Sequence, residues 1–385
     1  MGWNKHRSVS LFAVALLAST TLATLTSAQA AVAPALTGSC PTGTETLMPT
    51  SITALTGGGY SYHYRVNGLP QTQTVAPSSF RPATASDSTL REYDYPPRPA
   101  SGTTDDTQWL DHARTYRGTR ASTMCRSNHL ISSPTRPVTA STSGTNLGSP
   151  NWSGMVAAQT ASVEANRPFK FVQGQWVQTG YLNCNCSEPT DESTWAGMGG
   201  FQPNSTGQDG LIQDGTDMFS TDQPNSWWEY LYPCPGSTSE CGVSEQTAST
   251  VSIGDTIFAE TYWDGSAAHF LVEDNGFVLI SHTVTLPTSA WDGRNAEWIN
   301  ERPGQSTGGY DPLTNYGVQH WSNASACPTA TVGGTCYTAG QLSSNYLEME
   351  TNSQLNPETC SSAAVLAYPS GLSGGSFSSN WCRAQ

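Results

Sequence analysis

Short strand-like runs that end at Gly, Asn, Ser or Pro recur throughout residues 148–385 of this chain, and several alternate apolar and polar residues. Such runs are typical of β-strands, and no stretch of this part keeps a helical period over a useful length. The expected strands are 169–177, 195–198, 210–218, 227–232, 250–263, 268–272, 277–286, 296–300, 316–321 and 346–349. Many short strands with Gly-rich turns predict an all-β sandwich or jelly roll.

Three segments organise the chain. Residues 1–30 have a basic start, an apolar stretch from Val9 to Leu25 and a small-x-small cleavage site at 28–30, which predicts a signal peptide and a secreted protein. Residues 31–147 form an N-terminal region that ends in a linker rich in Ser, Thr and Pro. This region is a propeptide or a retained accessory region, and alternating tyrosines at 60–64 predict a strand in it.

Ten cysteines, an even number in a chain with an export signal, predict disulfides. Spacing and order favour four pairs, Cys40–Cys125, Cys234–Cys241, Cys327–Cys336 and Cys360–Cys382. Cys184 and Cys186 are too close to pair comfortably with each other. Because C-x-x-C, H-E-x-x-H and clustered His/Cys spacings are absent from the sequence, we expect no metal and no other cofactor.

The charge is distributed unevenly. Residues 31–145 carry nine Arg against seven Asp and Glu, a net charge of +2, whereas residues 146–385 carry five basic against 23 acidic residues, a net charge of −18. An anionic body argues against a nucleic-acid partner, since phosphate binding needs a basic face. No later stretch is long and apolar enough to span a membrane, so we expect no membrane partner. We also expect a monomer.

Two strings place a reactive polar side chain inside an apolar run: 210–215, which contains Gln213, and 295–299, which contains Glu297. Strand alternation predicts that Gln213 shares a face with Gly215 and Asp217, and that Glu297 shares a face with the alternate residues of its own strand. Other chemistries lack support. The G-x-S-x-G string at 371–375 has no later histidine, and paired Asp-Thr-Gly or Asp-Ser-Gly strings are absent from strand context.

Seven motifs in order resemble the glutamic peptidases, the eqolisin family of acid endopeptidases. They are Asn-Trp-Ser-Gly at 151–154, Gly-Gln-Trp-Val at 174–177, Trp-Ala-Gly-Met-Gly-Gly at 195–200, Leu-Ile-Gln-Asp-Gly at 211–215, Trp-Trp-Glu at 227–229, Ala-Glu-Trp-Ile at 296–299, and the closing stretch 369–381. The resemblance implies two packed antiparallel sheets in a concanavalin-like β-sandwich over residues 148–385, preceded by an N-terminal extension. One departure is Gly199, which stands where fungal members have an aspartate.

The resemblance implies catalysis by Gln213 and Glu297. A glutamate can act as general base and then general acid, and an amide remains a hydrogen-bond donor in acid, where imidazole is protonated. We therefore expect a secreted, pepstatin-insensitive endopeptidase that acts on polypeptides. Trp195, Asp217 and Glu229 are candidate neighbours that support the dyad or bind substrate.

Two alternatives remain open. A lectin-like sandwich would use some of the twelve tryptophans to bind sugar without cleaving peptides. A glycoside hydrolase would use two carboxylates, Glu297 with Glu229 or Glu260, and would give Gln213 no required chemical role.

Overall fold

The computed structural model describes residues 33–384 except 42, 128–146, 159–167, 183–188, 202–209, 220–222, 234–239, 288–292, 305–308, 329–333, 343, 352–359 and 362. The expected signal peptide and the Ser/Thr/Pro linker therefore lie outside the described residues. Residues 33–385 form one compact unit. Within the described residues, no helix is long and apolar enough to cross a membrane.

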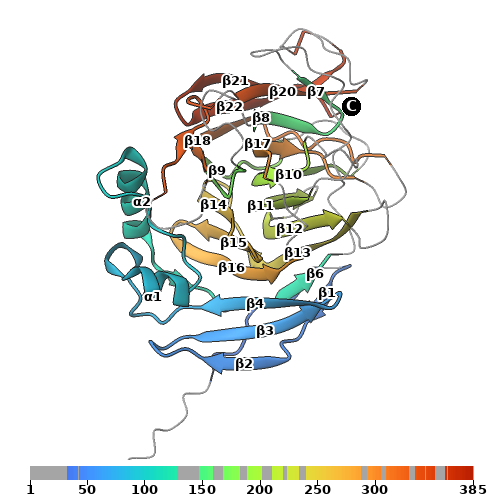
Figure 1. The fold of residues 1–385 in the computed structure, drawn as a ribbon. Helices are drawn as coiled ribbons and strands as arrows, with labels where there is room; N and C mark the ends of the chain where they lie inside the picture. The colour runs from blue at the N-terminus through green and yellow to red at the C-terminus, as the bar shows by residue number, and fades with distance from the viewer. Residues whose placement is uncertain are drawn as a thin grey trace, which may run out of the picture. The chain divides into compact units, whose positions relative to one another are not determined.

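The strands are hydrogen-bonded into one continuous sheet that folds back on itself in two layers (Figure 1). The first layer runs, in order of pairing, through β1 (Glu45–Leu47), β6 (Met124–Arg126), β13 (Glu240–Thr250), β12 (Asn225–Pro233), β11 (Leu211–Phe219), β10 (Asp191–Gly199), β17 (Asn295–Glu301), β8 (Trp152–Ala158) and β20 (Ser344–Glu350), with β7 (Leu147–Ser149) also beside β20.

The second layer continues from β20 through β21 (Val365–Ser373), β22 (Ser376–Trp381), β18 (Val318–Cys327), β9 (Phe171–Val177), β14 (Thr256–Trp263), β15 (Ala267–Asp274), β16 (Phe277–Thr285), β4 (Leu69–Val75), β3 (Tyr60–Val66) and β2 (Ser51–Ala54). Two short strands flank it, β5 (Gly118–Thr119) beside β16 and β19 (Tyr337–Thr338) beside β18. All pairings are antiparallel except β5–β16 and β7–β20.

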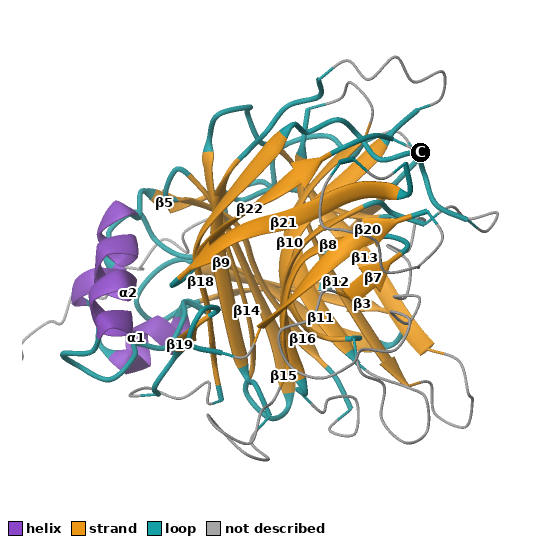
Figure 2. Cartoon of the chain, turned by 90° about the horizontal axis from the view of Figure 1, so that it is seen from above, coloured by secondary structure: helices purple, strands orange, loops and turns teal. Residues whose placement is uncertain are grey.

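The helices of the described residues lie in the N-terminal region: α1 (Asp87–Glu92), α2 (Thr104–Thr115) and the 3-10 turn Pro82–Thr84. Both α-helices begin at hydroxyl caps, because the Ser86 and Thr103 side chains accept a hydrogen bond from a first-turn amide. Figure 2 shows these helices at one side of the strands.

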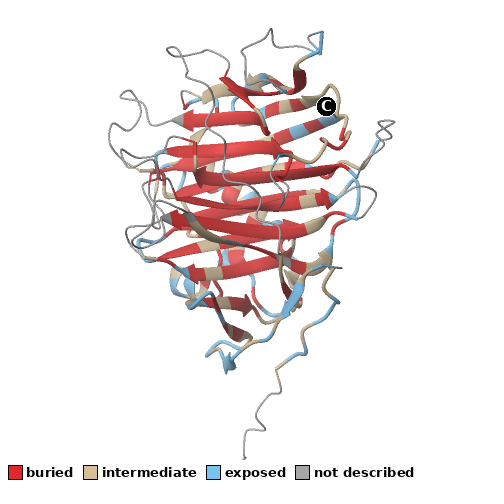
Figure 3. Cartoon of the chain, turned by 90° about the vertical axis from the view of Figure 1, so that its right-hand side faces the viewer, coloured by how far each residue is buried: buried red, intermediate tan, exposed pale blue. Residues whose placement is uncertain are grey.

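The core lies between the two layers, and Figure 3 shows that most of the strands are buried. Trp228 and Trp298 of the first layer and Ile257 and Phe270 of the second belong to one apolar cluster, each at most 1 % exposed. Alternation along each strand sends every second side chain into this cluster. The all-β sandwich expected from the sequence is confirmed.

Two features go beyond the expectation. The layers are one continuous sheet rather than two separate sheets, since β20 pairs with β8 and with β21. The N-terminal region also does more than precede the sandwich, because β6 and β4 add strands to the first and second layers. The expected strand at the alternating tyrosines is present as β3.

Three of the expected disulfides are confirmed: Cys40–Cys125, Cys327–Cys336 and Cys360–Cys382. Cys241 is also disulfide-bonded, and its expected partner Cys234 lies outside the described residues. Cys184 and Cys186 lie outside them as well.

Candidate active site

Gln213 and Glu297 lie on either side of one residue, Gly197, on three neighbouring strands. In β10, Gly197 is opposite Gln213 of β11 and opposite Glu297 of β17. Residues opposite each other in antiparallel pairs point to the same face, so both side chains project from one face of the first layer. Two strand spacings of about 4.8 Å put their Cα atoms about 10 Å apart.

Gly197 allows the Gln213 side chain and the Trp195 ring to pack closely over the backbone of β10. A Cβ at this position would lie 2.8 Å from the Gln213 Cβ and 2.9 Å from the Trp195 ring. Any larger residue would therefore displace the glutamine or the tryptophan.

The three other candidate residues occupy different places on the same face. Glu229 of β12 is directly opposite Gln213, so it is the nearest of the three to the glutamine. Trp195 is two residues before Gly197 on β10. Asp217 is four residues after Gln213 on β11, about 13 Å along the strand, and accepts a hydrogen bond from Ser193 Oγ.

The site lies in an apolar, enclosed setting. Gln213 is 1 % exposed, and Glu297 and Glu229 are fully buried. The same face carries a second apolar cluster with Trp152, Trp195 and Trp227 among its members. The Trp152 and Trp195 rings pack edge to face, with centroids 5.0 Å apart.

A buried carboxyl group anchors Trp195 beside the dyad. Trp195 Nε1 donates to Glu301 Oε2 at 2.9 Å, and Asn151 Nδ2 donates to Glu301 Oε1 at 2.8 Å. Burial raises the pKa of Glu301 to about 8, although these hydrogen bonds act to lower it. Glu301 is therefore neutral in acid and holds the tryptophan without adding negative charge beside Glu297.

The carboxylate pairs that a glycosidase would need are not brought together. Glu260 lies on β14 of the second layer, and its strand neighbour Phe258 packs on the side of the N-terminal helices. Glu229 lies on β12 and Glu297 on β17, three strand spacings or about 14 Å apart between Cα atoms, so Gln213 and Gly197 stand between these two glutamates in the register.

The remaining motifs have structural places. Ser373 ends β21 at the hairpin that leads into β22. His269 and His282 contact residues of the N-terminal region. Among the described residues, no group of three or more His, Cys, Asp or Glu side chains is arranged to hold a metal ion.

Three residues of the site were not identified from the sequence as functional. Gly197 is part of the string 195–200, but only the strand register shows that it separates the dyad. Asn151 and Glu301 come from strings 150 residues apart, and only their meeting through a hydrogen bond reveals that they support Trp195. The Asn-Trp-Ser-Gly motif was the one sequence signal that included either of them.

Comparison with protein-family models gives one match, to the Peptidase A4 family over residues 150–365, more than half of the chain. No curated protein and no solved structure matches the chain. The matched range contains the strands that carry the glutamine, the glycine and the glutamate, and it agrees with the resemblance drawn from the ordered motifs. The chain therefore belongs to the Peptidase A4 family, and it is a peptidase of the glutamic type.

Proposed function

We propose that the protein is a secreted acid endopeptidase in which Glu297 and Gln213 act together on a peptide bond. The observation that carries the proposal is the register of Gln213, Gly197 and Glu297 on one face of the first layer, in a chain of the Peptidase A4 family. The export signal and the disulfides support secretion.

The reaction follows from the two functional groups. The Glu297 carboxylate takes a proton from water, and the resulting hydroxide attacks the peptide carbonyl carbon. The Gln213 amide N–H donates a hydrogen bond to the oxyanion that forms. Glu297 then passes its proton to the leaving amine as the C–N bond breaks, which yields a new carboxyl group and a new amine. No covalent intermediate forms.

The neighbouring groups suit acid conditions. The amide of Gln213 does not titrate, so it remains a donor at every working pH. The pKa of Glu301 near 8 keeps that carboxyl neutral in acid. Because no pair of aspartates performs the reaction, pepstatin is not expected to inhibit it.

Gln213 and Glu297 are at most 1 % exposed in the uncut chain, so we expect substrate to reach them only after a local movement of the chain around the site. The Ser/Thr/Pro linker, which ends the N-terminal region of residues 31–147, is the expected processing site.

Variants of the two residues test the proposal, assayed on a denatured protein at low pH after activation. Gln213→Ala should lower kcat by about 10²–10³, the usual cost of removing one oxyanion donor, and Glu297→Gln should abolish turnover. Gln341→Ala and Glu45→Gln are the matched controls, since both residues are exposed and lie outside the site. Wild-type activity in either folded site variant would show that the assignment is wrong.

A further inference from the structure

Residues 148–385 alone would leave the sandwich open at one end. The two layers are joined through β20 and β21, whereas at the opposite end β13 and β16 would each be an edge strand. An edge strand exposes unpaired backbone N–H and C=O groups and invites aggregation.

The N-terminal region closes both edges. On the first layer, β6 pairs with β13, with Arg126 opposite Glu245. On the second layer, β4 pairs with β16, with Gln71 opposite Val284. Figure 1 shows β1 and β6 beside β13, and β2, β3 and β4 beyond β16. All the strands named above lie outside residues 128–146, so a cut in that segment leaves each of them whole.

The apolar core crosses this boundary. Tyr62, Tyr64, Val66, Val75 and Met124 of the N-terminal region belong to the same cluster as the core tryptophans, and each is at most 6 % exposed. Losing them would open the end of the core to water over several large side chains.

One buried amide ties the two layers together at this end. Gln71 Nε2 donates to Tyr230 Oη at 2.9 Å and to Glu245 Oε1 at 3.2 Å, both in the first layer. Its Oε1 lies 2.7 Å from His282 Nε2 of the second layer. Gln71 is 2 % exposed. Removing its amide would therefore break these hydrogen bonds in a place that water does not reach.

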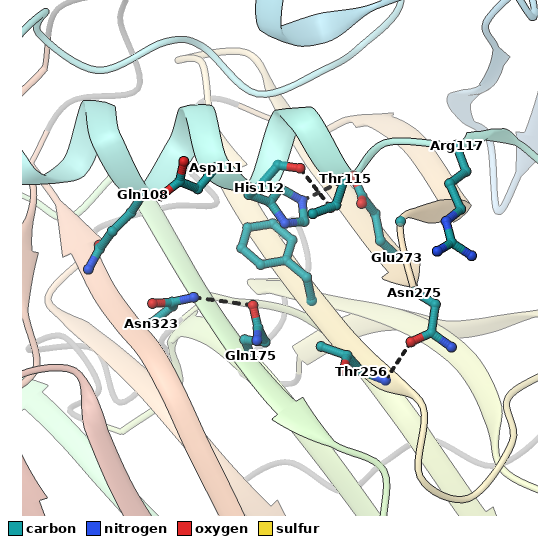
Figure 4. A pocket seen from close by; sticks show the side chains of 12 residues that line it. Gln108, Asp111, His112, Thr115, Arg117, Gln175, Thr256, Glu273, Asn275 and Asn323 are labelled. Atoms are coloured by element: carbon teal, nitrogen blue, oxygen red, sulfur yellow. Dashed lines mark hydrogen bonds and ion pairs between the residues drawn. The ribbon is translucent and has the colours of Figure 1, made fainter.

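The helices cover the outer face of the second layer. Phe80, Tyr95 and Trp109 belong to a separate apolar cluster. It also contains Phe258 of β14, Leu271 of β15 and Val278 of β16. His112 of α2 stacks on Phe258, with ring centroids 3.7 Å apart, and lies 3.2 Å from the buried Glu273 (Figure 4).

A second polar contact joins the region before α2 to β15 and β16. His269 Nδ1 lies 2.6 Å from Asp94 Oδ1, and His269 Nε2 lies 3.2 Å from Asp264 Oδ2. Thr283 Oγ1 also donates to Asp94, at 2.6 Å.

The N-terminal region has no disulfide to the rest of the chain. Cys40 and Cys125 are its only cysteines, and they pair with each other. After a cut in the linker, only non-covalent contacts hold the two pieces together.

We propose that residues 33–127 remain bound after the linker is cut, as a non-covalent subunit that closes the open end of the sandwich. The mature peptidase is then a two-chain protein, and the N-terminal region is a structural partner rather than a released propeptide. The subunit also borders the dyad face, because Ser39, Pro41 and Thr44 line a cavity of about 630 Å³ together with Asp191 and Asp217.

The test uses the full chain with a site for a specific protease placed within residues 128–146, in a Glu297→Gln background that prevents self-digestion. After cleavage near pH 5, size-exclusion chromatography and native mass spectrometry should show both fragments in one complex. Urea should separate them only in the transition that unfolds the body. Association is the readout, so the result does not depend on peptidase activity.

Loss of the N-terminal fragment from a body that stays folded and monodisperse would overturn the proposal. Gln71→Ala should raise the dissociation constant of the fragments at least tenfold. Thr72→Ala is the matched control, because this neighbouring side chain contacts His63 within the N-terminal region. Equal dissociation constants for the two variants would show that the amide does not hold the layers together.

Discussion

The buried carboxyl group of Glu192 allows a quantitative prediction about stability and pH. Its side chain is 1 % exposed, and two donors, Thr194 Oγ1 at 2.6 Å and Asn300 Nδ2 at 2.7 Å, bond to the same oxygen, Oε1. Burial is the main cause that raises its pKa from 4.5 to about 7. The folded state therefore holds this proton more tightly than the unfolded state does.

The sign and size of the effect follow from linkage. The contribution of Glu192 to the free energy of unfolding is fully present below pH 4.5 and is lost as the pH rises through about 7. At about 1.4 kcal/mol per pH unit, the difference between the two pKa values amounts to about 3 kcal/mol. A glutamine keeps Oε1 as an acceptor for both donors and cannot ionise, so Glu192→Gln should escape this loss.

The assay is urea unfolding followed by tryptophan fluorescence at pH 4 and pH 8. The free energy of unfolding should fall by about 3 kcal/mol less in Glu192→Gln than in the wild type between these two pH values. Glu45→Gln is the control, because Glu45 is exposed on β1 and its replacement removes no buried charge. Parallel pH curves for the wild type and Glu192→Gln would refute the reasoning.

Three further predictions concern other parts of the molecule. Gly197→Ala should lower peptide hydrolysis at least 100-fold, because its Cβ would lie 2.8 Å from the Gln213 Cβ and would displace the glutamine; a normal rate by the same acid assay would show that this close packing is not required. Asp94 is the main cause that raises the pKa of His269 to about 9, so this pair stabilises the fold most below about pH 6.5, and that stability is lost as the pH rises through 9. Asp94→Asn should therefore lower the free energy of unfolding by about 2 kcal/mol at pH 5.5 but not at pH 10, and an equal deficit at both pH values would contradict the ion pair. Replacing Cys360 and Cys382 together by serine should lower stability by about 3 kcal/mol in urea unfolding, since the bridge closes a loop of 22 residues; an unchanged midpoint would show that the tail is held by other contacts.

The strands that the sequence predicted well are those with a compact run of apolar residues between polar ends. The run 277–286 corresponds to β16, Phe277–Thr285, and the run 296–300 to β17, Asn295–Glu301. Both strands are buried over most of their length, and a short apolar run is a signal that the sequence itself shows.

The first half of β10 could not be predicted from apolar residues. Only 195–198 was expected, but the strand begins at Asp191 and includes Glu192, Ser193 and Thr194, all buried. Four polar residues in a row resemble a loop in sequence. They are tolerated in the interior because Glu192 bonds to Thr194 and Asn300, and these contacts depend on β17, more than 100 residues away.

The two residues of the proposed dyad, Gln213 and Glu297, stand out in the sequence only through the order of the motifs around them, and their catalytic role stays a prediction. What the sequence could not provide is their register. Gly197 gains its importance because β11 and β17 both pair with β10 at that residue, and pairing between distant strands is not encoded in any local string.

The continuous path of hydrogen bonds through β20 and β21 has a mechanical consequence. Two separate sheets could slide past each other, but here backbone hydrogen bonds through β20 and β21 join the two layers at one end of the sandwich. Opening fluctuations must therefore start at the opposite end, where β6 and β4 cover the edges of β13 and β16. Amide hydrogen exchange should accordingly form a gradient, fastest in β4 and β6 and slowest in β8 and β20.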